Sequence, residues 1–431
     1  MPLRLDRSRA DFTERFAAFL AAKREVSADI EKATRAIVDD VAARGDAALI
    51  EATLKFDRLD LDASRLRVTP GEIDAAVKAC DARTLEALEF ARDRIESFHR
   101  RQMPKDERFT DALGVELGWR WSAIESVGLY VPGGTAAYPS SVLMNAVPAK
   151  VAGVGRVVIV VPSPDGRLNP LVLAAARLSG VSEIYRVGGA QAVAALAHGT
   201  ATIAPVAKIV GPGNAYVAAA KRLVFGKVGI DMIAGPSEVL VIADATGNAS
   251  WIAADLLAQA EHDVNAQSIL ITDSSHLADE VEGAVQSQLA TLPRADIARA
   301  SWNDFGAIIL VKHLGDTVAL ADAIAAEHLE IMTSDPEALA AKIRNAGAIF
   351  LGAHTPEAIG DYVGGSNHVL PTARSARFSS GLGVLDFMKR TSILKCGPDQ
   401  LRALGPAAMT LGKAEGLDAH ARSVGLRLNL P

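Results

Sequence analysis

The chain has 431 residues and a formal net charge of −6, from 45 basic and 51 acidic side chains without a long run of either sign. This pattern argues against a nucleic-acid partner and against a polybasic membrane surface. No stretch approaches the roughly 20 apolar residues of a membrane span, and the N-terminus lacks a signal-peptide core. The two cysteines, Cys80 and Cys396, have no metal-type spacing, which argues against a disulfide framework and favours a cytoplasmic location.

The length is enough for roughly two to four domains with buried cores. Residues 1–126 are expected to form a helical region that packs on the body. One amphipathic face near the N-terminus consists of Phe12, Phe16, Phe19 and Leu20. Thr69-Pro-Gly-Glu72 has the capping-box spacing with proline at the first helical position, and it predicts the start of a helix.

From about residue 127, short β-rich runs alternate with alanine-rich helical stretches. The first series has expected strands 127–131, 156–161, 183–187 and 208–210, with helices 142–152, 169–178, 190–197 and 215–224. The second has strands 238–243, 268–272, 307–311, 330–333 and 348–351, with helices 250–262, 278–289, 317–328 and 336–345. Such alternation is typical of parallel sheets covered by helices on both faces.

The predicted fold class is therefore α/β, with two Rossmann-like parallel-sheet lobes over residues 127–235 and 236–375. Ligands are expected in the cleft between the lobes, at the carboxyl ends of strands. The regularity fails after Gly352, where Gly360 to His368 form a glycine-rich loop. Residues 376–431 are a small tail domain with only helical hints, and it should pack on another domain or intertwine with another subunit.

Gln259 and His262 stand three residues apart at the end of the expected helix 250–262, so their side chains leave it on the same side. An amide oxygen and an imidazole nitrogen held side by side could form half of a metal site. A polar helix end that faces water is the more common reason for such a pair. Because the sequence has no HExxH or CxxC spacing, any metal site must be assembled from distant segments.

Glu327 and His328 close the expected helix 317–328, just before a strand, and could serve as a general acid/base pair. On this stretch alone, an ordinary solvated helix end is the more common alternative. Asp361 and His368 flank the glycine-rich loop, where a carboxylate can approach a ligand. Three other histidines lie in charged surroundings and are expected at the surface: His99, His276 and His313.

Three glycine-rich turns follow expected strands and precede helices. They are Tyr130-Val-Pro-Gly-Gly134, Gly188-Gly189-Ala-Gln191 and Gly211-Pro-Gly213-Asn214. Each alone is a weak signal, because many strand–helix turns need glycine for positive φ. Together in one lobe, they make anion binding at helix N-termini an even alternative to a purely structural role.

Several motifs in series closely resemble the histidinol dehydrogenase family. They are Ile230-Asp-Met-Ile-Ala-Gly-Pro-Ser-Glu238, Gln259-Ala-Glu-His-Asp263, Glu327-His-Leu-Glu330, Gly360-Asp-Tyr-Val, Asn367-His-Val-Leu-Pro-Thr372, Arg377-Phe-Ser-Ser-Gly381, Asp386-Phe-Met-Lys-Arg390 and Glu415-Gly-Leu-Asp-Ala-His-Ala-Arg-Ser-Val424. They span almost the whole chain. Two positions depart from the family pattern: Ala326 replaces a usual proline, and Ala373-Arg374-Ser375 replaces a more common Gly-Gly-Thr.

The resemblance implies a homodimer with one Zn²⁺ per subunit that uses NAD to oxidise L-histidinol to L-histidine in two hydride transfers, the last steps of histidine biosynthesis. It implies zinc ligands at Gln259, His262, Asp361 and His420, the last from the partner subunit's tail. Glu327 and His328 match the acid/base pair. The ligands and this pair are expected to line the substrate site with Ser237, His368 and Glu415. The implied cofactor contacts are Tyr130, Gln191 and Asn214.

The chemistry of these side chains agrees with that assignment. One Asp, two neutral His and one Gln would leave zinc with a net charge of about +1, suited to holding the imidazole and amine of histidinol. His328 is the expected base for the alcohol proton, and Glu327 is expected to activate water for a gem-diol intermediate. Neither cysteine has a base beside it, so a thiolate nucleophile is unsupported.

Three rival functions follow from the same residues. A paralogous zinc- and NAD-dependent dehydrogenase could oxidise another polar alcohol, such as a sulfonated diol, although an anionic substrate would want added Arg or Lys near His368 and Glu415. A zinc hydrolase could use Glu327 to drive metal-bound water, but the glycine turns count against it. A non-catalytic protein that sequesters substrate would not need the complete set of site residues.

Overall fold

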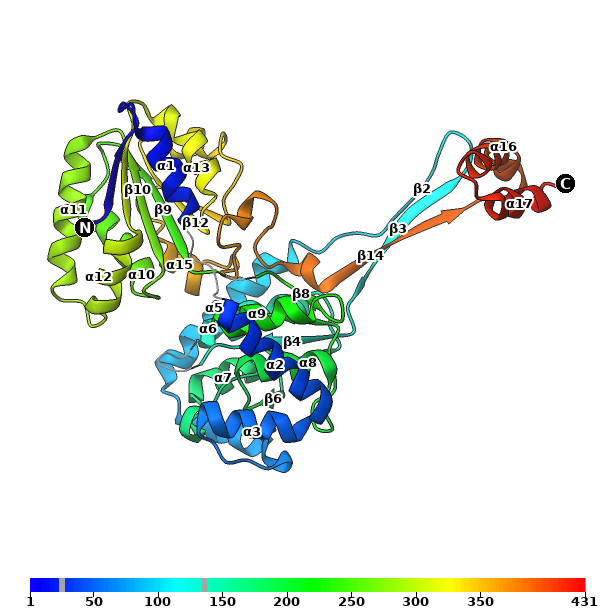
Figure 1. Cartoon of the computed structure of the whole chain (residues 1–431), viewed down its shortest axis with the longest axis horizontal. Helices are drawn as coiled ribbons and strands as arrows, with labels where there is room; N and C mark the ends of the chain where they lie inside the picture. Colours follow the sequence, from blue (N-terminus) through cyan, green and yellow to red (C-terminus); the bar gives the residue numbers. More distant parts are fainter. Residues whose placement is uncertain (23–27, 134–137, 234, 431) are drawn as a thin grey trace.

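The computed structural model describes residues 1–431 apart from 23–27, 134–137, 234 and 431. Two α/β lobes form the body, and a long β arm carries a helical tail away from it (Figure 1). The α/β class with two parallel-sheet lobes is thus confirmed. None of the described helices combines the length and apolar character needed to cross a membrane. Cys80 and Cys396 are both free thiols.

The first lobe is built on a five-stranded parallel sheet in the order β6-β5-β4-β7-β8. Its strands are β4 (Ser126–Tyr130), β5 (Arg156–Val160), β6 (Glu183–Tyr185), β7 (Lys208–Val210) and β8 (Gly229–Ile230). One face packs on α4 (Pro70–Ala79), α5 (Ala82–Arg100), α6 (Pro139–Val151) and α7 (Pro170–Leu178). The other packs on α2 (Ala28–Arg44), α3 (Asp46–Asp57), α8 (Gly189–His198) and α9 (Ala215–Val224).

The second lobe has a six-stranded parallel sheet in the order β1-β11-β10-β9-β12-β13. Its strands are β1 (Leu3–Asp6), β9 (Glu238–Ala243), β10 (Gln267–Thr272), β11 (Ala307–Leu310), β12 (His328–Met332) and β13 (Ala348–Leu351). One face packs on α10 (Ala249–Ala260), α11 (Ser275–Leu289) and α12 (Ala295–Phe305). The other packs on α1 (Phe12–Ala21), α13 (Thr317–Ile324) and the segment of α14 (Pro336–Ala340). The short helix α15 (Glu357–Tyr362) follows β13.

The N-terminal region is not helical throughout, which corrects the expectation for residues 1–126. Residues Leu3–Asp6 form the edge strand β1 of the second sheet, because their backbone pairs in parallel with β11. Helix α1 follows and buries Phe12 and Phe16 against the same lobe, as its amphipathic pattern predicts. Of the N-terminal helices, α2 to α5 cover the first lobe. The capping box of α4 forms as expected, with Thr69 Oγ1 accepting from the Glu72 backbone N–H.

The arm is a three-stranded antiparallel sheet that the sequence did not predict. Strand β14 (Met388–Lys395) pairs with β3 (Glu116–Ala123), which pairs with β2 (Glu107–Thr110). At its far end, α16 (Pro398–Ala414) and α17 (Asp418–Arg427) pack on each other and form the tail (Figure 1). Short 3₁₀ turns complete the described chain: η1 (Ala63–Arg65), η2 (Pro164–Gly166), η3 (Leu314–Asp316), η4 (Ser375–Arg377) and η5 (Val384–Phe387).

In each sheet, successive strands are added first on one side of the starting strand, β4 or β9, and later on its other side. The reversal falls between β4 and β7 in the first sheet and between β9 and β12 in the second. In open α/β sheets such a reversal point opens a crevice beyond the carboxyl ends of the strands. In the first lobe, the glycine-rich turns lie at the carboxyl edge of the sheet, as this rule predicts. In the second lobe, the polar groups lie at the opposite, amino edge.

Candidate active site

The sequence-predicted acid/base pair lies at the amino edge of the second sheet. The expected helix 317–328 is wrong at its end, because Ala325 adopts a left-handed conformation (φ 49°) that stops α13 at Ile324. Glu327 therefore lies in the connection that follows, and His328 is the first residue of β12. Both side chains are buried, so the pair is not an ordinary solvated helix end.

His328 is surrounded by carboxylates. Its Nδ1 lies 3.2 Å from the backbone oxygen of Glu238, 3.7 Å from Glu357 Oε2 and 3.8 Å from Glu327 Oε2, and its Nε2 lies 3.4 Å from Asp361 Oδ1. Burial by itself lowers the pKa of His328, but these carboxylates outweigh it and raise the pKa well above the usual value. The imidazole is thus surrounded by negatively charged groups that favour its protonated form.

The buried carboxyl group of Glu327 accepts a hydrogen bond from the backbone N–H of Glu238 at 3.0 Å. Burial raises the pKa of Glu327 to about 7, against the opposing effect of His328. A carboxyl group with a pKa near neutrality can take and return a proton at physiological pH, as a general acid/base requires.

Gln259 is fully buried in the last turn of α10, where neither polar atom of its amide has a hydrogen-bond partner. Two unpaired polar atoms in a dry position cost free energy, so an amide left in this state indicates a missing ligand. His262 follows in the turn after α10, where its backbone N–H donates to the Gln259 carbonyl at 3.2 Å. Desolvation lowers the pKa of His262 and keeps its imidazole neutral, although part of the residue is exposed.

Asp361 and His368 come from α15 and the glycine-rich loop that follows it. Burial favours the neutral form of Asp361, but the contact with His328 and nearby imidazoles prevail and lower its pKa. His368 Nδ1 lies 3.0 Å from the backbone oxygen of Asp361, and its Nε2 lies 3.3 Å from Ser141 Oγ on α6. His368 therefore bridges the two lobes, and burial lowers its pKa.

The loop is fixed by the first lobe. Arg94 on α5 donates to the backbone oxygens of Val363 and Gly364, and Asn367 Nδ2 donates to Met144 O at 2.6 Å. His99, expected at the surface, is instead fully buried, with Nδ1 2.7 Å from Ile95 O and Nε2 3.4 Å from Asn367. The sequence signal for this burial is the apolar stripe of α5, which includes Ile95 four residues earlier.

Three further buried carboxyl groups were not predicted from the sequence, and one of them, Glu357, lies beside His328. The backbone N–H of Glu357 on α15 donates to Glu330 Oε1 on β12 at 2.8 Å, and the second carboxyl oxygen of Glu330 has no hydrogen-bond partner. Burial raises the pKa of Glu357 to about 8, opposed by His328. Burial also raises the pKa values of Asp255 and Glu330, the latter further because of the Asp255 charge.

Ser237 lies directly before β9, where its backbone oxygen accepts from Gln267 at 2.9 Å. Because β9 pairs with β12, Ser237 stands at the same sheet edge as His328. Seven of the sequence-predicted residues thus gather around this edge: Ser237, Gln259, His262, Glu327, His328, Asp361 and His368.

His420 and Glu415 are not brought to this edge. His420 belongs to α17 and Glu415 ends α16, both are exposed, and the arm carries the tail away from the body (Figure 1). Among the described residues, no group of three or more His, Cys, Asp or Glu side chains could hold a metal ion. A cavity of about 550 Å³ between α5 and the second lobe contains none of the sequence-predicted site residues.

The three sequence-predicted cofactor contacts lie at the carboxyl edge of the first sheet. Tyr130 ends β4 and its ring is buried; its hydroxyl accepts from the Gly189 N–H at 3.0 Å. Burial raises the pKa of Tyr130 to about 12. Gln191 is buried in the first turn of α8, and Asn214 caps α9 by accepting from Tyr216 and Val217. Gly134 of the Tyr130 turn lies outside the described residues.

The turn before α9 is fixed by a buried ion pair. Asp231 Oδ2 accepts from the Gly211 N–H at 2.7 Å, while Lys221 bonds to Asp231 and to the Gly211 oxygen. Gly211 has φ +109°, and a Cβ there would lie 2.2 Å from the oxygen of Tyr130. This glycine is therefore required by a close backbone approach at the point where the first sheet reverses.

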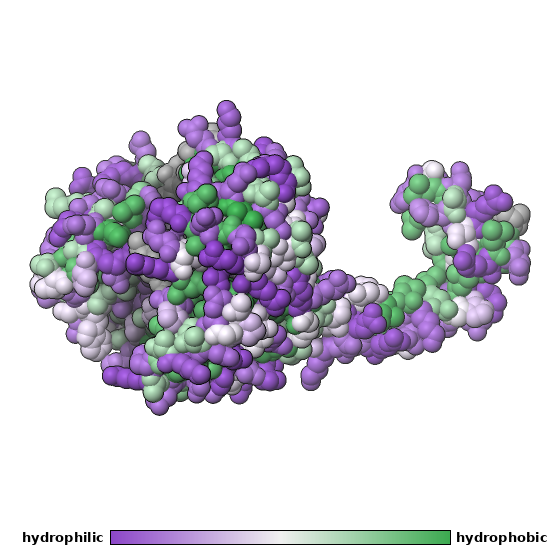
Figure 2. Space-filling view, turned by 90° about the horizontal axis from the view of Figure 1, so that it is seen from below, coloured by the Kyte–Doolittle hydropathy of each residue, from purple (hydrophilic) through white to green (hydrophobic). Residues whose placement is uncertain are grey.

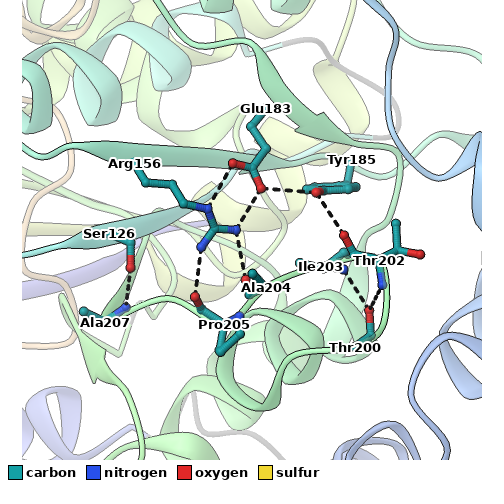
Figure 3. Close-up of polar contacts among 10 residues, drawn as sticks. All are labelled: Ser126, Arg156, Glu183, Tyr185, Thr200, Thr202, Ile203, Ala204, Pro205 and Ala207. Carbon is teal, nitrogen blue, oxygen red and sulfur yellow. Dashed lines mark hydrogen bonds and ion pairs between the residues drawn. The ribbon is translucent and has the colours of Figure 1, made fainter.

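The amino edge of the first sheet is closed by structural contacts (Figure 3). Arg156 makes two bonds to Glu183 at 2.8 and 3.0 Å and donates to the oxygens of Ala204 and Pro205. Tyr185 donates to Glu183 and to Thr202 O, which connects the same network to the loop before β7. No sequence-predicted site residue takes part in this network.

Two residues that replace glycines of the family pattern adopt glycine-like conformations. Ala373 and Arg374 have φ values of 52° and 64°, in the left-handed region. The loop packs on the connection between the lobes, where Thr372 Oγ1 accepts from the Gly235 N–H at 2.6 Å. Both residues thus hold a backbone conformation that glycine adopts at lower cost.

Comparisons with known proteins point to one family over almost the whole chain. The family model described as histidinol dehydrogenase matches residues 20–428. Curated histidinol dehydrogenases from Bradyrhizobium diazoefficiens and Nitrobacter winogradskyi are each 85% identical, with 100% of both chains covered. The crystal structure of histidinol dehydrogenase from Elizabethkingia anophelis is 35% identical, with a TM-score of 0.94 over 99% of this chain and 98% of that one.

Proposed function

Because the chain belongs to the histidinol dehydrogenase family, we propose that it oxidises L-histidinol through the aldehyde to L-histidine, with Zn²⁺ and NAD as cofactors. This reaction is part of histidine biosynthesis. The single observation that supports the assignment most strongly is the buried Glu327–His328 pair beside Asp361 and the unpaired amide of Gln259.

The residues present fit a zinc ion. Gln259 supplies an amide oxygen without another partner, His262 a neutral imidazole, and Asp361 a carboxylate whose pKa is lowered. Zinc binds such deprotonated or neutral N and O donors. We propose these three residues as ligands, with His420 of a second subunit as the fourth. Bound zinc would hold the imidazole and amine of histidinol in a fixed orientation.

The cofactor is proposed to bind at the carboxyl edge of the first sheet. Two helix N-termini, of α8 and α9, lie there behind glycine-rich turns, and backbone N–H groups at such ends attract phosphate. Gln191 and Asn214 stand in or before these first turns, and the Tyr130 hydroxyl adjoins the Gly189 N–H. NAD bound there would accept the two hydrides.

In its neutral form, His328 is proposed to take the alcohol proton, and the carboxylates that raise its pKa also make it a stronger base. The Glu238 carbonyl accepts from Nδ1–H at 3.2 Å, which assigns the proton of the neutral ring to Nδ1 and leaves the lone pair on Nε2. Nε2 is the ring atom directed at Asp361 and therefore at the proposed metal and substrate. Removal of the proton there lets the carbinol carbon release its hydride.

Glu327 is proposed to act between the two hydride transfers. The aldehyde must gain water before a second hydride can leave, and a carboxylate near its pKa of about 7 can take the water proton. The product of that addition is a gem-diol. A thiohemiacetal has no support, since Cys80 lies in the first lobe, hydrogen-bonded to Ala76 O, and Cys396 follows the arm.

The tail is proposed to complete the active site of a partner in a cytoplasmic homodimer with shared sites. His420 and Glu415 stand far from their own His328, at the end of the arm (Figure 1). The arm and tail carry exposed apolar side chains that a subunit contact would cover, among them Leu394, Leu411 and Leu426. Figure 2 shows apolar patches on the arm and on the tail, which stands clear of the body.

The test is turnover by the purified, zinc-loaded enzyme with L-histidinol and NAD. Formation of NADH and histidine is expected. Faster turnover of a sulfonated diol would instead favour the paralogous dehydrogenase. Product formation without NAD would favour a hydrolase, and binding of histidinol without turnover would favour sequestration.

A further inference from the structure

The segment that follows β5 binds an acidic side chain from a distant part of the chain. Ser163 is buried in this segment, and its backbone N–H donates to Asp57 Oδ2 at 3.0 Å. Asp57 is the last residue of α3 and is 7% exposed. Its second oxygen, Oδ1, has no hydrogen-bond partner among the described residues. A carboxylate with one oxygen free to accept thus adjoins the end of β5.

This contact lies at the edge of the sheet where the cofactor is proposed to bind. Pro162, two residues after β5, packs on two of the glycine-rich turns: a Cβ at Gly133 would lie 2.8 Å from its ring, and a Cβ at Gly188 would overlap with it as well. Burial is the main cause of the raised pKa of Tyr130, and the charge of Asp57 adds to it. The carboxylate of Asp57 is therefore a neighbour of the Tyr130 phenol.

The position of β5 in the sheet indicates what this carboxylate could bind. Counted along the lobe, the order β6-β5-β4-β7-β8 is 3-2-1-4-5, as in doubly wound dinucleotide-binding sheets. In those sheets an acidic side chain about 20 residues beyond the first glycine-rich turn, where the second strand ends, accepts from the ribose 2′-hydroxyl. The second strand here is β5, and Asp57 reaches its end from α3.

A purely structural role explains Asp57 poorly. It stands at the C-terminal end of a helix, where the dipole disfavours negative charge, and burial raises its pKa. No basic side chain forms an ion pair with it within the described part of the chain. Arg58 pairs with Asp165 at 2.7 Å, and Arg186 after β6 pairs with Glu72 at 2.8 Å. The charge of Asp57 is thus left to act on a ligand.

We propose that Asp57 determines a preference for NAD over NADP by accepting a hydrogen bond from the 2′-hydroxyl of the adenosine ribose. The proposal rests on the function proposed above and adds the residue that discriminates between the two cofactors. In NADP a phosphate is attached to this oxygen, so the donor is lost and an anionic group meets the carboxylate. Arg58 and Arg186 are bound to other carboxylates and do not offset this repulsion.

The experiment measures cofactor binding rather than turnover. The zinc-loaded enzyme is titrated by calorimetry with NAD, with NAD that lacks the adenosine 2′-hydroxyl, and with NADP. L-Histidine, the product, fills the substrate site and prevents turnover. Asp57→Asn keeps an acceptor oxygen for the Ser163 N–H but removes the charge. Asp244→Asn is the matched control, because Asp244 follows β9 in the other lobe, is 8% exposed and accepts from the Ser334 N–H at 2.7 Å.

In the wild type and in Asp244→Asn, loss of the 2′-hydroxyl should weaken binding about tenfold, because a hydrogen bond to a charged group is worth roughly that factor, and NADP should bind more weakly still. In Asp57→Asn, NAD and its deoxy analogue should bind within about threefold of each other, and NADP should gain about tenfold relative to NAD. The Tm of Asp57→Asn should stay near wild type.

Equal binding of NAD and the deoxy analogue by the wild type would overturn the role of Asp57, and this comparison needs no variant that must fold. An unchanged ratio of NADP to NAD affinity in folded Asp57→Asn would overturn it as well. Absence of NADH when the wild type is given L-histidinol and NAD would instead contradict the proposed function itself.

Discussion

The amino edges of the two parallel sheets carry very different polar groups, although the sheets share one building plan. In the first lobe, Arg156 and Glu183 close this edge with paired structural bonds (Figure 3). In the second lobe, the same edge carries Glu327 and His328, buried among carboxylates that have few partners. In both sheets, the order in which strands are added reverses at an interior strand, β4 in the first and β9 in the second. The comparison teaches that topology locates a crevice, whereas unsatisfied side chains show which edge is used for chemistry.

The two lobes also differ in the groups that they offer to a ligand. The first lobe presents backbone N–H groups and glycine turns, such as the Gly211 turn fixed by Asp231. The second presents ionisable side chains with displaced pKa values. The first arrangement suits a phosphate-bearing cofactor, and the second suits metal binding and proton transfer. Each of the following predictions tests one of these two arrangements by a substitution that affects it.

The largest effect is expected from His328→Gln in the second lobe. Loss of the base should lower turnover with L-histidinol by about 10²–10⁴-fold, because general base catalysis is worth that much. Zinc content and the KM for NAD should stay near wild type, since His328 is neither a proposed ligand nor part of the first lobe. A variant that retains more than a tenth of the activity would contradict the role of His328.

The next prediction tests whether the zinc site of the second lobe takes its fourth ligand, His420, from the other subunit. His420→Asn alone should lose zinc and most activity. Mixed with His328→Gln under conditions that exchange subunits, it should regain about a quarter of wild-type activity, because each mixed dimer holds one intact site. Absence of any recovery, with mixed dimers demonstrated, would show that the tail does not cross between subunits.

A smaller and different effect is expected in the first lobe from Gly211→Ala. Its Cβ would lie 2.2 Å from Tyr130 O, so the turn must shift, and the KM for NAD should rise roughly tenfold at unchanged zinc content. Gly226→Ala is the control, because Gly226 has a similar φ of +100° but open space around its Cβ. Equal effects of the two changes would assign the loss to backbone strain alone.

The smallest effect concerns the pH dependence of stability. Glu357 has a pKa of about 8 in the folded chain, against an ordinary value of 4.5, so the native state binds the extra proton between these limits. The stability contribution is therefore full below pH 4.5 and is lost as pH rises to about 8. Glu357→Gln should weaken the decrease of stability with rising pH, so that the Tm of the variant relative to wild type increases from pH 5.5 to pH 8. A constant difference in Tm would contradict a raised pKa.

Much of the fold could be predicted from the sequence, because strand and helix periodicities alternate clearly after residue 127. The junction at Glu327 could not, since Ala325 gives no helix-stop signal even though it adopts a left-handed conformation. The arm was not predicted because β14 is mostly exposed, β3 is mostly half-buried, and the two pair over a separation of about 270 residues, which no local pattern reveals.

The site was predicted through family motifs rather than through periodicity. The buried carboxyl groups of Asp255 and Glu330 do have a sequence signal: Asp255 stands beside Leu256 in the apolar stripe of α10, and Glu330 interrupts an apolar strand. Acidic side chains are rarely fully buried unless they are paired. The distance of His420 from its own site could not be predicted, because it depends on the direction in which the arm leaves the body.

The central claim is that one site performs both oxidations, and product stoichiometry tests it most directly. The zinc-loaded enzyme is given limiting L-histidinol with excess NAD, and NADH and histidine are both quantified at completion. The account predicts two NADH and one histidine for each histidinol. One NADH for each histidinol, with the aldehyde as the accumulated product, would contradict it.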